Sequence, residues 1–433
     1  MNSGWNAVVP TLEPEQRARI VEEVSQTFRG MPLSELRGDR EKLVNRTIPM
    51  IRAILGRYAI HASPEAISEM AREVVAHVGG LGFLEPLLRL DSGYSEIAVT
   101  PEGRVWVVPR GEQDFISLAV QPSLNDVWRA VETLLAPLGR GVSEATPSVD
   151  TRIPRQEGLP GGARVKIIHP VIAPGDGYPS LNIRLYEPKP VPPEQLVAWE
   201  VAPEWLIHAL VEAVGKGARL LVIGGTATGK TTVLSALCSG IPKTARVVKI
   251  EDPEEIWLDH PHVVTLEVRP SQAGSSVAPY TQARAVDDAM RMSPRWLIVG
   301  EIRRGEAADA LFRAQWSDHA GLSTFHAESP EAAVGRLSLM LFTDLGIRTE
   351  GAKEMFAGAI DLVVQVGFRL NEQGKPRRRI VGVWAVEKHL RAGNVAFHPL
   401  YQSPGESIGE RLPLAALETM FDPGISREQE VPQ

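Results

Sequence analysis

Residues 220–235, LLVIGGTATGKTTVLS, decide the fold that we expect for this chain. An apolar run with the character of a strand leads into a glycine-rich turn, and Lys230 and Thr231 then open a helical pattern. Gly224, Gly229, Lys230 and Thr231 fit G-x-x-x-x-G-K-[ST], with the strand before it and the helix after it that this motif requires. The stretch therefore predicts a phosphate-binding loop for a nucleoside triphosphate.

The backbone of this loop is expected to hold phosphate oxygens. Successive N–H groups between the two fixed glycines point into one concavity, helped by the positive end of the following helix. The Lys230 ammonium then reaches the β- and γ-phosphates of ATP, and the Thr231 hydroxyl is one ligand of Mg²⁺. A chance glycine loop also matches the pattern, but the strand at 220–223 and the lack of proline before Pro242 favour the phosphate loop. The expected nucleotide contacts are Gly224, Gly225, Thr226, Ala227, Thr228, Gly229, Lys230, Thr231 and Thr232.

Length and composition set wide limits on what this chain does. With 433 residues, two or three domains of ~100–200 residues are expected. A net charge of −7 gives no reason to expect nucleic-acid binding. The single cysteine, Cys238, excludes a disulfide within the chain and a four-cysteine zinc module. The N-terminus lacks the features of a signal peptide and no run approaches the ~20 apolar residues of a membrane span, so we expect a cytoplasmic protein that reaches a membrane only through a partner.

Periodicity divides the part before the phosphate loop into three regions. Residues 1–79 are expected to be helical, with helices at 13–28, 40–59 and 64–78. Residues 80–186 are expected to form an α+β domain, with strands at 96–100, 104–108, 165–169 and 181–185 and a helix at 123–135. The proline-rich segment 187–200 is expected to be a stiff linker.

From 201 to 402, helices and strands alternate. This pattern predicts an α/β domain, a RecA-like phosphate-loop fold with a mostly parallel sheet, whose ligands bind at the carboxyl ends of the strands. The basic run at 375–379 is expected to be a solvated hairpin tip. Residues 403–433 are expected to form a polar C-terminal tail.

Acidic residues follow two of the expected buried strands. Glu301 follows the run LIVG, and Gly300 stands where many phosphate-loop enzymes have the aspartate that helps to hold Mg²⁺. Another acid must then assist the metal, and Glu251, Asp252 and Glu255 follow the strand VVKI. Carboxylates at strand ends are often only helix caps or surface charges, but two such clusters in one phosphate-loop domain favour a catalytic interpretation.

His319 and His326 are separated by seven positions, which is not a familiar metal spacing. Each alone is more readily explained as an ordinary satisfied side chain. Near a nucleotide, however, a neutral histidine can donate to a γ-phosphate and report its presence.

Four motifs together resemble one protein family. The order GGTATGKTT, IEDPEE, MRMSPRWLIVGEIRRGEA and DHAGLSTFHAESP resembles the Walker A motif, Asp box, Walker B motif and His box of the secretion and pilus-assembly ATPases. The upstream stretches GLGFLEPLL, SEIAV, VDTRIP, GARVKIIHP and SLNIRLYE resemble the N-terminal domain of that family, especially its type IV secretion and tight-adherence branch. The resemblance covers about 80–400.

The resemblance implies roles for individual residues. It makes Glu301, Glu251, Glu255 and His326 catalytic, Thr231, Asp252 and Glu251 the ligands of Mg²⁺, and His319 a further contact of the nucleotide. Arg152, Arg164, Arg184 and Arg303 match arginines that can approach the phosphates, and we expect one or two of the four to do so. A guanidinium offers paired donors to the charge on a transferring phosphoryl group, although any single arginine is more often a surface residue.

The sequence departs from the family in three places. Ala227 stands where the loop of the family usually has glycine, and the segment between Pro154 and Arg164 is longer than in many relatives, which bears on how Arg152 is presented. The cysteine-based zinc module of many type II members is missing, so no zinc is expected.

The resemblance implies an ATP-hydrolysing homo-hexamer that powers pilus assembly or protein secretion, docked on an inner-membrane platform or channel protein. Three other functions stay open at this point. A retraction motor shares every motif, but it usually carries an AIRNLIRE-like signature that is missing here. A nucleic-acid translocase shares the nucleotide chemistry but needs basic loops or aromatic stacking positions. A scaffold that only binds ATP fits poorly with Lys230 and Glu301.

Overall fold

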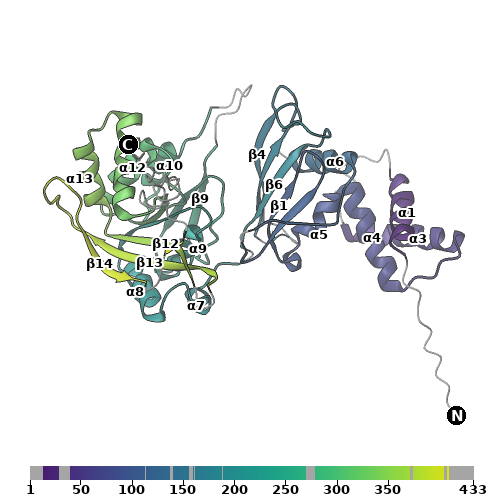
Figure 1. Ribbon diagram of the computed structural model, residues 1–433, viewed down its shortest axis with the longest axis horizontal. Helices are drawn as coiled ribbons and strands as arrows, with labels where there is room; N and C mark the ends of the chain where they lie inside the picture. The colour runs from purple at the N-terminus through teal and green to yellow at the C-terminus, as the bar shows by residue number, and fades with distance from the viewer. Residues whose placement is uncertain are drawn as a thin grey trace, which may run out of the picture. The chain divides into compact units, whose positions relative to one another are not determined.

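The computed structural model describes residues 13–28, 40–112, 114–136, 140–155, 159, 161–187, 189–269, 278–370, 374–403 and 407–408. The chain divides into two compact units, and the division falls between Lys189 and Pro190. The first unit contains the helical region and an antiparallel sheet, and the second contains the phosphate loop (Figure 1).

Among the described residues, the first unit begins with three helices: α1 (Pro14–Gln26), α3 (Arg40–Arg57) and α4 (Pro64–Gly79). The side chain of Ser63 accepts a hydrogen bond from the backbone N–H of Ala66 and caps α4, and Pro64 occupies the first turn, where no backbone donor is needed. The apolar faces of the three helices pack together in a small core that includes Val24, Ile51 and Val74.

A six-stranded antiparallel sheet follows among the described residues of this unit, in the order β3-β2-β1-β6-β5-β4. Its strands are β1 (Tyr94–Val99), β2 (Val105–Pro109), β3 (Ile116–Ser117), β4 (Ser148–Ile153), β5 (Ala163–Ile168) and β6 (Ser180–Leu185). Alternate residues of these strands pack against α6 (Leu124–Leu135), α5 (Glu85–Leu88) and the short 3-10 helix η1 (Gly82–Leu84). The short helix η2 (Leu90–Ser92) leads into β1. The remaining positions of β4, β5 and β6 face away from this core and are polar apart from Ile168.

The second unit contains a nine-stranded sheet among its described residues, in the order β14-β13-β12-β7-β11-β10-β8-β9, with β15 paired to β12. The six strands from β12 to β9 run parallel, and β13, β14 and β15 extend the sheet in antiparallel fashion. The strands are β7 (Arg219–Gly224), β8 (Val247–Glu251), β9 (Val263–Glu267), β10 (Trp296–Val299), β11 (Ala320–His326), β12 (Leu362–Leu370), β13 (Pro376–Val386), β14 (Phe397–Gln402) and β15 (Ser407–Ile408). The mostly parallel α/β sheet with a preceding α+β domain is the fold predicted from the sequence, and that prediction is confirmed.

Helices cover both faces of this sheet because its central strands are apolar on both sides. Leu220 and Val222 of β7 face a core with α7 (Pro193–Ala198), α8 (Glu204–Gly215), α9 (Lys230–Leu237) and η4 (Cys238–Gly240). Leu221 and Ile223 face a core with α10 (Gln282–Met290), α11 (Gly305–Trp316), α12 (Pro330–Leu345) and α13 (Thr349–Ala359). Figure 1 shows α10, α12 and α13 on one side of the sheet and α7 and α8 on the other.

The segments expected to be a linker and a polar tail both contain regular structure. Within the expected linker 187–200, helix α7 buries Leu196 in the core of the second unit. Within the expected polar tail, Ser407 and Ile408 pair with β12 as β15. Residues 404–406 and 409–433 lie outside the described part of the chain.

None of the helices in the described ranges is long and apolar enough to cross a membrane.

Candidate active site

The phosphate loop joins the end of β7 to the start of α9 and depends on two glycines. Gly224 has φ +158°, and a Cβ there would lie 2.3 Å from the carbonyl oxygen of Val366 and 2.7 Å from Oγ1 of Thr228. Gly229 caps α9 with φ +94°, a conformation that favours glycine. The fixed glycines of the motif are therefore required by close backbone approach at one end and by backbone conformation at the other.

Lys230 folds back onto the carbonyl oxygens of the loop. Its Nζ donates to the carbonyls of Gly224 at 3.2 Å and Gly225 at 2.8 Å, and the Thr228 hydroxyl also donates to the Gly225 carbonyl at 2.9 Å. In a trans peptide the carbonyl and the next N–H point in opposite directions, so donors that hold the carbonyls leave the N–H groups directed away from them. This arrangement, at the N-terminus of a helix, fits the binding of phosphate oxygens.

Ala227 has φ +59°, a left-handed conformation that costs a residue with a Cβ about 1–2 kcal/mol. The strain explains why a glycine suits this position in the family. The Ala227 carbonyl accepts a hydrogen bond from Nε of Arg378 at 3.0 Å.

The prediction that residues 375–379 are only a solvated hairpin tip is wrong for two of its arginines. Arg378 contacts the phosphate loop, and Arg379 pairs with Glu200 at 2.7 Å. The pattern misled because β13 already begins within the run, so these arginines belong to a strand beside the loop rather than to the turn. A run of basic residues alone does not distinguish a solvated turn from a strand whose side chains contact the rest of the protein.

Strand register brings the candidate catalytic residues to one edge of the sheet. His326 of β11 lies level with Gly224 of β7, and Val299 of β10 lies level with Ile250 of β8. Glu301 follows β10 and Asp252 follows β8, so both leave the sheet at the same carboxyl edge as the phosphate loop. This is the edge at which ligands bind in such sheets.

Arg303 links the acids of two motifs. Its Nε donates to Oε2 of Glu301 at 2.8 Å, and its Nη1 lies 3.4 Å from both the carbonyl oxygen and Oδ2 of Asp252. All three side chains are between 33% and 43% exposed, so they are open to solvent and to a ligand. The structure thus brings Glu301, Asp252 and Arg303 together at the loop edge of the sheet.

Glu251 occupies a different environment from the one expected of a metal ligand. Its side chain is 2% exposed, its Oε1 accepts from the backbone N–H groups of Glu255 and Ile256, and its Oε2 accepts from Lys249 Nζ at 2.7 Å. Lys249 Nζ also donates to Oε1 of Glu254 at 2.8 Å and to the Ile256 carbonyl at 2.5 Å. This buried, fully bonded carboxylate holds the turn after β8 in place, and the expectation of direct catalysis and Mg²⁺ ligation by Glu251 is corrected accordingly.

The position of Glu251 also explains Gly300. A Cβ on Gly300 would lie 3.2 Å from Cγ of Glu251, closer than ordinary van der Waals contact. A side chain at this position would therefore force the buried Glu251 to shift. The glycine therefore follows from the packing of the turn after β8.

The two histidines lie at opposite ends of β11. Burial and the positive charges of Lys230 and Arg336 lower the pKa of His326 from its ordinary 6.5, so this imidazole is neutral at pH 7. His319 precedes β11, and seven residues of extended chain put it roughly 20 Å from His326. His319 instead contacts the Ala314 carbonyl at 3.1 Å, so the prediction that it contacts the nucleotide on this loop is corrected.

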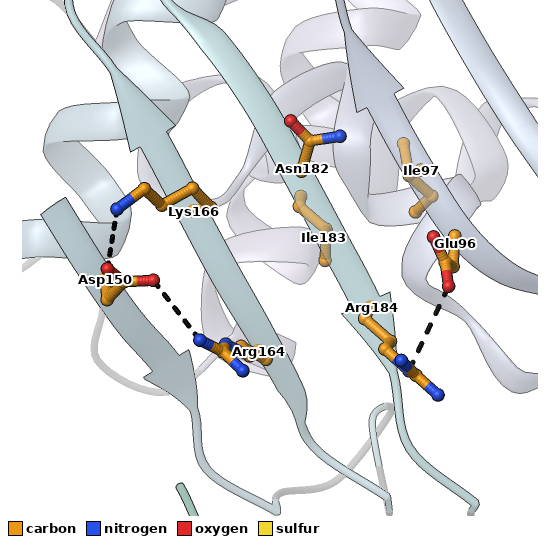
Figure 2. Close-up of a pocket in the computed structure, with 8 residues that line it drawn as sticks. All are labelled: Glu96, Ile97, Asp150, Arg164, Lys166, Asn182, Ile183 and Arg184. Carbon is orange, nitrogen blue, oxygen red and sulfur yellow. Dashed lines mark hydrogen bonds and ion pairs between the residues drawn. The ribbon is translucent and has the colours of Figure 1, made fainter. Parts of the chain in front are cut away.

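Arg152, Arg164 and Arg184 lie in one row across the first unit's sheet. Arg152 of β4 pairs with Arg164 of β5, and Arg164 pairs with Arg184 of β6. Arg164 lies 3.6 Å from Asp150, and Arg184 lies 4.0 Å from Glu96 (Figure 2). Two members of this arginine row (Arg152, Arg164 and Arg184), Arg164 and Arg184, line an open pocket of about 390 Å³ on the polar face of the sheet, together with Lys166 and Asn182. The register explains how the three arginines share one face, and their approach to the phosphates stays a prediction.

The oxygen ligands near the phosphate loop fit a magnesium ion that is shared with phosphates. Thr231 lies in the first turn of α9, and Asp252 supplies a carboxylate at the same edge of the sheet. Within the described ranges no three His, Cys, Asp or Glu side chains converge on one point. Mg²⁺ in nucleotide sites takes most of its ligands from phosphates and water, so one hydroxyl and one or two carboxylates suffice.

Two residues near the site were missed from the sequence. Lys249 could have been noticed as a lone cation inside the apolar strand VVKI, where burial demands a partner. Arg378 had no comparable signal, because the β12–β13 hairpin reaches the loop only through the pairing of β12 with β7, which is distant in sequence.

Comparisons with known proteins agree with the geometry. Residues 79–379, more than half of the chain, match the family described as Type II/IV secretion system protein. A putative conjugal transfer protein of Mycobacterium tuberculosis is 27% identical over 346 residues, which cover 77% of this chain and 96% of that protein. The type IV secretion system protein PtlH of Bordetella pertussis is 32% identical over 251 residues, which cover 52% of this chain and 73% of that protein.

Solved structures share the fold. The Legionella pneumophila ATPase DotB is 18% identical with a TM-score of 0.50, over 70% of this chain and 78% of that chain. The pilus retraction motor PilT, solved with ADP, is 17% identical with a TM-score of 0.50, over 74% of this chain and 83% of that chain. Together with the family match, these relatives confirm the resemblance that the four motifs indicated. The chain belongs to the type II/IV secretion system protein family and is an ATPase of that family.

Proposed function

We propose that this secretion ATPase is a homo-hexameric motor that uses ATP and Mg²⁺ to power pilus assembly or protein secretion from the cytoplasmic side of a membrane. One observation carries the proposal: the phosphate loop, Glu301, Asp252 and His326 meet at the carboxyl edge of one parallel sheet. A phosphate-binding loop, a carboxylate and a neutral imidazole at one edge of the sheet are groups suited to the hydrolysis of a γ-phosphate.

Each residue has a distinct part in this proposal. The loop N–H groups and Lys230 hold the β- and γ-phosphates, and Thr231 and Asp252 hold the ion that neutralises them. Glu301 orients the attacking water and accepts its proton. His326, neutral at pH 7, donates to the γ-phosphate. Arg303 leaves Glu301 when a nucleotide binds, because the carboxylate cannot activate water while it pairs with a guanidinium.

The arginine row is the proposed source of a further guanidinium for the phosphates of a nucleotide on a phosphate loop, in the same chain or in a neighbouring one. Ion pairs of 3.6 and 4.0 Å with Asp150 and Glu96 are loose and partly exposed, so phosphate competes with them readily. Glu255 stays a candidate for the acid cluster, because it lies in the turn that Glu251 holds.

The proposal is tested with the purified full chain. We expect phosphate release that depends on Mg²⁺, loss of ATP binding in Lys230→Ala, and a sixfold assembly in sedimentation with Mg²⁺ and a non-hydrolysable ATP analogue. In cells, the chain is expected to co-purify with an inner-membrane platform or channel protein. A chain that stays monomeric with nucleotide, or whose hydrolysis is stimulated by DNA, would argue against a secretion motor.

A further inference from the structure

Arg378 lies two strands away from the phosphate loop and still contacts the loop backbone. Strand β12 separates β13 from β7, and Val366 of β12 lies level with Gly224 at the end of β7. Phe368, two residues further along β12, pairs with Arg378. The β12–β13 pair thus continues past the end of β7 and carries Arg378 to the level of the loop.

The contact is specific in its geometry. Nε of Arg378 donates to the Ala227 carbonyl at 3.0 Å, and Cδ of Arg378 lies where it would come within 3.5 Å of a Cβ on Gly229. The side chain therefore lies along the second half of the loop, from Ala227 to the residue that caps α9. Lys230 holds the carbonyls of the first half, at Gly224 and Gly225.

The orientation of a carbonyl fixes the orientation of the next N–H. Because the peptide between Ala227 and Thr228 is planar and trans, a carbonyl held toward Arg378 directs the Thr228 N–H to the opposite side. Ala227 is in a left-handed conformation that a residue with a Cβ tends to leave, so this peptide is the part of the loop with the most reason to flip. A charge-assisted hydrogen bond at this carbonyl opposes the flip.

We propose that Arg378 is a positioning residue for phosphate binding, which holds the Ala227–Thr228 peptide so that its N–H faces the bound phosphates. It acts through the loop backbone rather than on the transferring group. Loop N–H groups serve the phosphates that ADP and ATP share. The proposal therefore requires that both nucleotides depend on Arg378 to the same degree.

The test compares Arg378→Gln and Arg378→Lys with Arg377→Gln in the full chain. Arg377 is the exposed neighbour on β13, so its variant removes the same charge from the same strand without touching the loop. Calorimetry gives the Kd of Mg·ADP and of a non-hydrolysable ATP analogue, and steady-state assays give KM and kcat. We expect Arg378→Gln to weaken both nucleotides about tenfold and to raise KM by the same factor, with kcat within about twofold of wild type. Arg378→Lys keeps a charged donor and should recover most of the affinity.

Several outcomes would overturn this role. Unchanged nucleotide affinity in Arg378→Gln would disprove the positioning role. An equal loss of affinity in Arg377→Gln would show that only the positive charge of the strand matters. A loss confined to the ATP analogue would make Arg378 a direct ligand of the γ-phosphate instead. The melting temperature without nucleotide checks folding, and Arg378→Met, which also removes the donor, carries the comparison if the glutamine variant does not fold. If the wild-type chain bound neither nucleotide, the phosphate site itself would be disproved, which is a different result from a selective effect of Arg378.

Discussion

Glu301 and Asp252 both form ion pairs with Arg303 in the structure. Arg303 lies 2.8 Å from Glu301 and 3.4 Å from Asp252, so two carboxylates that would repel each other are bridged by one guanidinium. A cation bound with phosphates can take over this neutralising role and release Glu301. The two acids were predictable from sequence, because each follows an apolar strand.

His326 provides a test at the same scale. Burial, Lys230 and Arg336 lower its pKa below 6.5, although Glu328 and Glu301 act in the opposite direction. The folded state favours the neutral ring, so His326 contributes stability above pH 6.5 that is lost as the pH falls through the lowered pKa. NMR titration of labelled histidines, with His326→Gln to assign the resonance, should give a midpoint below 6.5. A midpoint above that value would contradict the proposed neutral donor.

Two residue assignments show where sequence reasoning fails. Glu251 is the last residue of β8, whereas Glu301 lies beyond the end of β10, and Glu251 is held in the interior by Lys249, two positions earlier on the same side of the strand. His319 and His326 were grouped because they are close in sequence, yet an extended strand separates them in space. The lysine that binds Glu251 and the length of β11 between the two histidines, rather than residue type, decide where these side chains lie.

At the amino ends of β7 and β12, the carboxylate of Asp361 binds two cationic side chains. Arg219 donates to Asp361 through its backbone N at 2.8 Å and its side chain at 2.9 and 2.7 Å, and Lys388 adds a contact at 2.6 Å. Burial alone raises the pKa of Asp361, but the hydrogen bonds from Arg219 and Lys388 outweigh it and lower the pKa to about 2. These ion pairs help to hold β7, the strand that leads into the phosphate loop, beside β12.

We expect Asp361→Asn to lower the free energy of unfolding by about 2 kcal/mol at pH 7. Because the folded pKa is below the unfolded value of 3.8, the contribution is complete above pH 4 and is lost as the pH falls toward 2. Urea unfolding of both proteins between pH 7 and pH 3 measures the difference, which should narrow in acid. A constant difference across this range would show that Asp361 acts through packing alone.

The arginine row gives a prediction at the level of strands. Replacing Arg152, Arg164 and Arg184 together by glutamine should lower kcat by about 10³ if they supply a guanidinium to the transferring phosphoryl group. Lys166→Gln is the matched control, since Lys166 lies on the same face and pairs with Asp150 at 2.6 Å. We expect the control to stay within twofold of wild type. Equal phosphate release by the triple variant and wild type would remove the row from the mechanism.

Elements with strong apolar periodicity were predicted well, and those with mixed signals were missed. The predicted helix at 123–135 and strand at 181–185 match α6 and β6. Helix α13 was missed because Gly351 and Gly358 weaken its helical propensity. Helix α7 was missed because prolines dominate its surroundings, although Pro193 at its first position is a helix-start signal.

At the scale of the whole molecule, the chain combines a nucleotide unit with a unit whose sheet presents a polar, arginine-rich face. The fold class followed from the alternation of helices and strands around one motif. The order of the strands did not, because the pairing of β12 with β7, which places the β12–β13 hairpin beside the loop, joins segments that are distant in sequence. That pairing is what brings Arg378 to the phosphate loop.

The central claim is that Glu301 activates water for ATP hydrolysis on this phosphate loop. The most direct measurement is phosphate release under saturating Mg·ATP by wild type and by Glu301→Gln, with nucleotide affinity measured in parallel. Glutamine keeps the shape of the side chain but cannot accept the proton, so the rate should fall by about 10²–10⁴ while ATP still binds. Equal rates in the two proteins would contradict the account.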